Sequence, residues 1–125
     1  LTLAWKYPEK FKSVSAFAPI CAPCDCPWGE KAFLTYLGDD RELWKAHDAT
    51  QLVLEKGTLL SEVLIDQGLA DQFYSQLNPE KYQQACLKVG QKLTLRQHAD
   101  YDHGYYFIQT FMDEHLQFHA LQLQK

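Results

Sequence analysis

The sequence lacks the features that mark several large classes of protein. No apolar run approaches the roughly 18–20 residues that a membrane-spanning helix needs. The net charge of −4 argues against a nucleic-acid-binding surface, which is normally basic. There is no internal repeat, low-complexity run or linker. At 125 residues the chain therefore fits one small domain, and we expect neither a membrane nor a nucleic acid as its partner.

Cysteine is present, but its distribution does not predict a disulfide framework. Cys21, Cys24 and Cys26 share one loop, and Cys86 lies far away in a predicted helix. This pattern suits a reducing cytosol, so we expect a cytoplasmic protein. Cys21-x-x-Cys24 could supply two zinc ligands, but no second Cys-x-x-Cys follows to complete a structural site. We interpret the cluster as free thiols.

A second candidate for metal binding is the pair His115 and His119, spaced as i and i+4 on a predicted helix. A zinc helix of the protease type would also place a glutamate directly after the first histidine. Leu116 stands there instead. The sequence therefore favours a solvated or partly packed helix face at these positions.

Apolar runs and turn residues predict strands that alternate with helices. Strands are expected at 13–20, 59–66 and 92–98. Helices are expected over 1–10, 30–37, 40–46, 48–56, 79–89 and 104–121, with a Pro- and Cys-rich loop at 21–29. This alternation indicates an α/β fold of parallel strands with helices on both faces. Three strands make a thin sheet, so we expect further strands beside them.

Two residues with the chemistry of an acid–base pair follow the second and third predicted strands. Asp71 and His103 lie in loops that one βαβ unit should bring together beyond the strand ends. In a catalytic triad the histidine acts as the base, and the acid holds its ring in the right tautomer. Asp66 competes with Asp71 for the acid's role, and the pattern favours Asp71 only weakly. Without other information, a packed loop histidine bonded to Asp102 would explain His103 better.

The nucleophile that would complete this pair is absent from the sequence. An acid followed by a histidine is the second half of the α/β-hydrolase order Ser…Asp…His, whose serine lies on a Gly-x-Ser-x-Gly turn. No such pentapeptide occurs. Residues 1–5 read as part of a helix already running, as the helix after that turn would be. We therefore expect the chain to be the C-terminal half of an enzyme.

Several long strings, in the right order, resemble the S-formylglutathione hydrolases, which are also called the esterase D family. They are SAFAPIC at 15–21, CPWGEKAF at 26–33, YLG at 36–38, LIDQGLADQF at 64–73, LTLR at 93–96 and YDHGYYFI at 101–108. The resemblance covers residues 1 to about 121. It implies that residues 1–125 are the C-terminal part of a single α/β-hydrolase domain, whose serine and oxyanion donors lie upstream.

The resemblance also assigns roles. Asp71 matches the acid of the triad and His103 its histidine, while Trp28 lies in a loop near the mouth of the family's active site. Trp28 is equally well explained as a core residue, and Cys21 is better explained as a small buried residue than as one that touches substrate.

The function implied by the resemblance is hydrolysis of S-formylglutathione to formate and glutathione in formaldehyde detoxification, with no cofactor. A broad short-chain carboxylesterase and a non-catalytic truncated fragment are the alternatives. The partner is then a small-molecule substrate, and a homodimer is left open.

Overall fold

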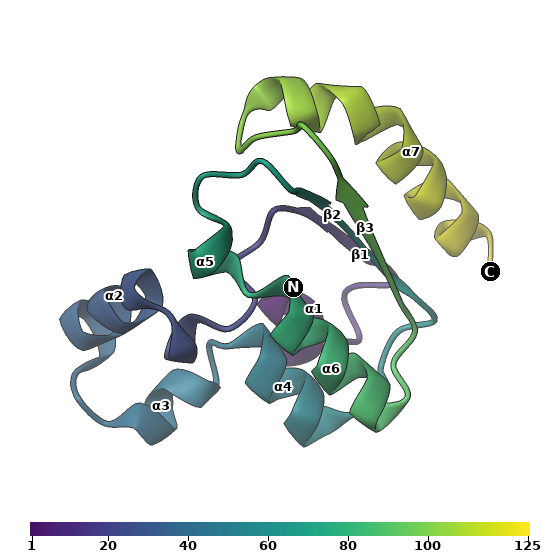
Figure 1. Ribbon diagram of the computed structural model, residues 1–125. Helices are drawn as coiled ribbons and strands as arrows, with labels where there is room; N and C mark the ends of the chain where they lie inside the picture. Colours follow the sequence, from purple (N-terminus) through teal and green to yellow (C-terminus); the bar gives the residue numbers. More distant parts are fainter.

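The computed structural model describes residues 1–125, and its centre is a three-stranded parallel sheet in the order β1-β2-β3 (Figure 1). The strands are β1 (Val14–Phe17), β2 (Val63–Gly68) and β3 (Leu93–His98). Val63 lies opposite Val14 in β1 and Leu93 in β3. The central strand β2 is buried along its whole length, as expected for a parallel strand covered on both faces.

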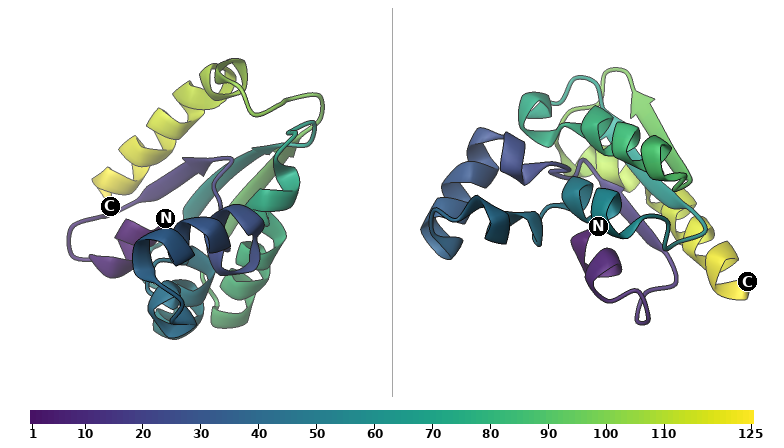
Figure 2. Two further views of the ribbon diagram at one scale, coloured as in Figure 1. Left: turned by 90° about the vertical axis from the view of Figure 1, so that its left-hand side faces the viewer. Right: turned by 90° about the horizontal axis from the view of Figure 1, so that it is seen from below.

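Helices cover both faces of the sheet. They are α1 (Thr2–Lys6), α2 (Pro27–Leu37), α3 (Arg41–Lys45), α4 (Ala49–Lys56), α5 (Tyr74–Leu77), α6 (Pro79–Val89) and α7 (Tyr105–Gln124), with a 3₁₀ turn, η1 (Pro23–Asp25), before α2. Figure 2 shows α7 alone on one face, with α1, α4 and α6 on the other and α2 and α3 extending beyond the sheet. The predicted α/β fold, with parallel strands and helices on both faces, is confirmed.

The main differences from the expected elements have local causes. The second strand was expected from residue 59 but begins at Val63. The Gln91 side chain accepts from the amides of Leu59 and Leu60 and donates to the Leu60 carbonyl, so a glutamine takes the place of a strand partner here. Helix α5 was not expected, because four residues are too short to show a helical period.

The main hydrophobic core lies between the sheet and the layer formed by α1, α4 and α6. Trp5 and Tyr82 meet edge to face at its centre, with their ring centroids 6.4 Å apart. Val63 and Ile65 project into this layer from β2. A smaller cluster of Ala18, Leu77 and Phe107 lies nearer the carboxyl ends of the strands.

Helix α7 is held to the opposite face largely by polar groups centred on Asp66. The fully buried Asp66 carboxylate accepts hydrogen bonds from Arg96 at 2.6 and 2.7 Å, from His98 at 2.9 Å and from His115 at 2.7 Å. Burial alone would raise the pKa of Asp66, but the bonds from His115, Arg96 and His98 outweigh it and hold this pKa well below its ordinary value.

The same network continues from α7 to β1. His115 Nδ1 is 2.8 Å from Ser15 Oγ, which is 2.8 Å from His119 Nε2, and His119 Nδ1 is 2.7 Å from Ser13 Oγ. The expectation of a solvated or partly packed face holds for the half-buried His119, but it is wrong for His115, which is only 2% exposed. The serines of β1 and the buried Asp66 supply the polar partners that make this burial favourable.

The loops after β2 and β3 are tied to each other through the backbone. Leu69 donates to the His98 carbonyl at 2.9 Å, and Ala70 donates to the Tyr101 carbonyl at 3.0 Å. Gly68 permits this approach, because a Cβ there would stand 2.2 Å from the Tyr101 oxygen. The tie fixes the distance between the segments that carry Asp71 and His103.

No helix combines the length and the apolar character that a membrane crossing requires.

The first strand, β1, pairs only with β2, so its other edge carries no strand partner. Apolar side chains of the neighbouring segments, Leu3, Tyr7, Phe11 and Ile20, are exposed.

Replacing Asp66 with asparagine should lower the free energy of unfolding by about 3 kcal/mol near neutral pH, because it removes a charge that three buried or partly buried donors share. The pKa of Asp66 is lowered in the folded protein. As the pH falls, the unfolded chain therefore binds a proton at this carboxylate before the folded protein does. The stabilisation is therefore present above about pH 4 and is lost as the pH falls below it.

Urea unfolding of the protein and of the variant over a range of pH tests this. The difference in unfolding free energy should shrink below about pH 4, and a difference that stays constant down to pH 2 would contradict the argument. The control is Glu114→Gln, which removes only the half-exposed partner of Arg96 and should cost less than about 1 kcal/mol.

Replacing Gly68 with alanine should lower the free energy of unfolding by about 1–3 kcal/mol, because the added methyl group overlaps the Tyr101 carbonyl and forces the two loops apart. The urea midpoint measures the loss. Hydrogen exchange at the Ala70 amide should become faster than in the parent. Slower exchange there, or an unchanged midpoint, would show that the loop accommodates the methyl group and keeps the hydrogen bond from Ala70 to Tyr101.

Candidate active site

Asp71 and His103 are in direct contact at the carboxyl end of the sheet. His103 Nδ1 lies 2.7 Å from Asp71 Oδ2. The Asp71 side chain is completely buried, and the Phe73 amide donates to its other oxygen, Oδ1, at 2.8 Å. A buried carboxylate held in this way keeps the proton of a neutral His103 ring on Nδ1, which leaves Nε2 as the acceptor.

The free side of the His103 ring faces open space. Its side chain is 36% exposed, and Nε2 makes no hydrogen bond within the chain. A cavity of about 50 Å³ adjoins the ring and is lined by Phe17, Ala18, His103, Gly104, Phe107 and Ile108. The pair therefore has the geometry of a base with an orienting acid, in which Nε2 is placed to accept a proton from a hydroxyl group.

The competing acids have other contacts. Asp66 points to the face covered by α7, where it binds Arg96, His98 and His115 rather than His103. Asp102 does not bond the His103 ring. Side chains alternate between the faces of a strand, so Asp66 and the neighbouring Gln67 project in opposite directions, and only Gln67 is directed towards Asp71.

A row of aromatic rings leads from the surface to the histidine. Trp28, in the first turn of α2, is 43% exposed, and its ring centroid is 4.8 Å from that of Phe73. The Phe73 ring meets His103 edge to face at 5.3 Å. The Trp28 amide also donates to the side chain of Gln76, in α5, at 3.0 Å. Trp28 is thus a surface residue beside the site, and not a core tryptophan.

Three of the four cysteines, Cys21, Cys24 and Cys86, are poorly suited to nucleophilic chemistry. Cys21 is fully buried, and burial raises the pKa of its thiol to about 12. Burial and the nearby Asp48 carboxylate raise the pKa of Cys24 to about 12, and burial raises that of Cys86 to about 11. The thiolate is the reactive form, so these groups are almost entirely unreactive at neutral pH. No cluster of three or more His, Cys, Asp or Glu side chains is placed to hold a metal ion.

Two glutamines beside the pair did not stand out in the sequence. The Gln67 amide donates to Asp71 Oδ2 at 3.1 Å, and the Gln72 side chain accepts from the backbone N–H of His103 at 3.4 Å. Gln67 could have been noticed, because it is a polar residue on the face of the strand that is otherwise apolar, with Val63 and Ile65. Gln72 is exposed and gives no such signal.

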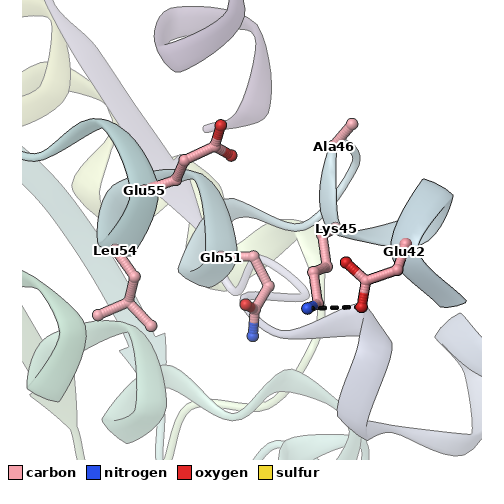
Figure 3. A pocket seen from close by; sticks show the side chains of 6 residues that line it. All are labelled: Glu42, Lys45, Ala46, Gln51, Leu54 and Glu55. Atoms are coloured by element: carbon pink, nitrogen blue, oxygen red, sulfur yellow. Dashed lines mark hydrogen bonds and ion pairs between the residues drawn. The ribbon is translucent and has the colours of Figure 1, made fainter.

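A larger hollow lies elsewhere on the surface, between α3 and α4. It measures about 620 Å³ and contains neither Asp71 nor His103. Figure 3 shows the lining side chains, Glu42, Lys45, Ala46, Gln51, Leu54 and Glu55, with the ion pair between Lys45 and Glu42. Its lining offers no base with an orienting acid, so the Asp71–His103 pair remains the candidate site.

Comparison with known proteins agrees with the motifs. The chain is 50% identical over 125 residues to an S-formylglutathione hydrolase of Arabidopsis thaliana, covering 99% of this chain and 44% of the relative. It is 49% identical to an S-formylglutathione hydrolase of Rattus norvegicus, again over 44% of the relative's length. The chain thus spans less than half the length of the relatives that it matches.

A solved structure and a family model extend the comparison. An S-formylglutathione hydrolase from Agrobacterium tumefaciens superimposes with a TM-score of 0.93 at 50% identity, over 98% of this chain and 44% of that one. The resemblance seen in the sequence is therefore confirmed. The model of the esterase family, described as "Putative esterase", matches residues 1–118. Matched over almost its whole length, the chain belongs to this esterase family.

Proposed function

We propose that this chain is the C-terminal part of a serine thioesterase that hydrolyses S-formylglutathione to formate and glutathione. The observation that carries the proposal is the 2.7 Å hydrogen bond between His103 Nδ1 and the buried Asp71, in a chain about 50% identical to S-formylglutathione hydrolases. The serine and the oxyanion donors belong to the rest of the enzyme, because no nucleophile turn occurs in this sequence.

In the proposed mechanism His103 moves the protons. Its Nε2 takes the proton of the serine hydroxyl as the serine oxygen attacks the formyl carbon. The C–S bond then breaks, and the departing glutathione sulfur receives that proton from His103. A water molecule attacks the formyl-serine ester, gives a proton to His103 and releases formate, and the serine oxygen recovers its proton. Asp71 stabilises the imidazolium that forms at each step.

The surroundings of His103 suit this arrangement. The cavity beside the ring lies next to Phe17 and Ala18, where β1 ends and where its unpaired edge faces away from β2. We place the serine on that side, carried by a strand that pairs with β1. Trp28 and Phe73 then form an aromatic wall on another side of the ring, where Trp28 contacts the substrate.

The wider setting is also proposed. A cytoplasmic enzyme of formaldehyde detoxification, acting without a cofactor, fits this substrate and the free thiols. A homodimer remains a prediction from the sequence. A broad short-chain carboxylesterase is the second candidate, since the same pair serves any acyl transfer. Comparing kcat/KM for S-formylglutathione with kcat/KM for acetyl and butyryl esters separates the two, and we expect the formyl thioester to be preferred by at least tenfold.

In the full-length enzyme, His103→Ala should lower kcat for S-formylglutathione by several powers of ten, because the base is removed. Asp71→Asn should lower it by about 10⁴-fold, the loss seen when the corresponding amide fixes the wrong tautomer in a serine protease. Steady-state kinetics with each purified variant measures both effects.

The controls are Cys24→Ser and Cys26→Ser, which should leave kcat nearly unchanged because neither thiol touches the pair. Full activity in His103→Ala would refute the mechanism. The 125-residue chain alone should show no turnover, and hydrolysis by it that depends on His103 would reveal a nucleophile within these residues.

A further inference from the structure

The amide of Gln67 is placed to fix the Asp71 carboxylate. Its Nε2 donates to Asp71 Oδ2 at 3.1 Å and to the Gly68 carbonyl at 3.0 Å. The side chain is fully buried, at the end of the β2 face that carries the core residues Val63 and Ile65. Of all the side chains in the structure, only those of Gln67 and His103 contact this carboxylate by hydrogen bonds.

The orientation of this amide is unambiguous. Both neighbours of Nε2, the Gly68 carbonyl and the Asp71 carboxylate, are acceptors without a proton to give. Turning the amide over would press its oxygen against two oxygens, so the donor must face Asp71. In this orientation Oε1 has no hydrogen-bond partner, although it is buried. Leaving a buried oxygen unpaired is unfavourable. The amide of Gln67 nevertheless adopts the orientation that directs its N–H group to Asp71 and leaves Oε1 unpaired.

The contacts of Asp71 form a clamp. The Phe73 amide holds Oδ1, and Gln67 holds Oδ2 from the side of the core. Two donors on two different oxygens prevent the carboxylate from rotating about its Cβ–Cγ bond. The remaining direction at Oδ2 is the one that His103 Nδ1 occupies at 2.7 Å.

The geometry points to Gln67 as a positioning residue for the hydrolysis, acting on His103 through Asp71. This inference rests on the proposed function, since it assigns Gln67 a part in the same acid–base pair. Gln67 does not face the open side of the ring, so it acts on proton transfer and not on substrate binding. Its loss should therefore lower kcat and leave KM nearly unchanged.

The test is Gln67→Met in the full-length enzyme, because methionine has a similar length and shape but no N–H donor. We expect kcat for S-formylglutathione to fall about 10- to 100-fold, the range found when a residue that orients a histidine ligand through a hydrogen bond is removed from a metal site. KM should change less than twofold. The downfield proton resonance of the His103 Nδ1–H group should broaden or shift, since the Asp71 plane is no longer fixed.

A matched control separates this role from loss of a buried amide in general. Gln91 is a buried glutamine whose side chain makes four hydrogen bonds, all to the backbone of residues 59, 60 and 92, away from Asp71. Gln91→Met should lower the unfolding temperature but keep kcat and the His103 resonance. If Gln67→Met does not fold, Gln67→Asn keeps an amide in the core but draws it back from Asp71, and the same fall in kcat is expected.

The outcomes distinguish the two proposals. Full kcat and an unchanged resonance in Gln67→Met, with His103→Ala inactive, would overturn the role of Gln67 and leave the proposed function standing. Activity in His103→Ala would overturn the proposed function itself. A fall in kcat of equal size in Gln91→Met would show that Gln67 contributes only to stability.

Discussion

Alternation of side chains along β2 is the constraint on which the rest of the structure depends. The strand is buried on both faces, yet it carries two adjacent polar residues, Asp66 and Gln67. The pleat sends Asp66 to the face where α7 docks and Gln67 to the face that continues towards Asp71. A shift of one residue in the register would exchange these two side chains, bury each among the wrong partners and separate α7 from its anchor.

The sequence predicts most of the framework, because strands and long helices leave strong periodic signals. The Asp48 cap of α4, the glycines after α2 and α4, and the proline that opens α6 are all where turn and cap chemistry places them. The start of β2 was misplaced because the apolar residues at 59 and 60 read as strand, whereas the side chain of Gln91, distant in sequence, satisfies their backbone. Local patterns carry no information about such a partner.

The candidate site shows the same division. Strand ends and family strings indicate Asp71 and His103, but the choice between Asp66 and Asp71 depends on which face of the sheet each side chain meets. The hydrogen bond between His115 and Asp66 joins α7 to β2. It buries a histidine that the sequence pattern predicts at the surface of the helix. The sequence marks Gln67 as a polar residue at a core-facing position, but its partner is defined only when the loop after β2 folds back and brings Asp71 against it.

The backbone tie between the loops after β2 and β3 has a consequence for how the site tolerates motion. The hydrogen bonds that align Asp71 and His103 all lie within one continuous βαβ unit, from β2 to the start of α7. An element outside that unit can therefore change what approaches Nε2 without adding or removing a hydrogen bond at the Asp71 carboxylate. Every hydrogen bond to the Asp71 carboxylate thus comes from one stretch of the sequence, between β2 and the start of α7.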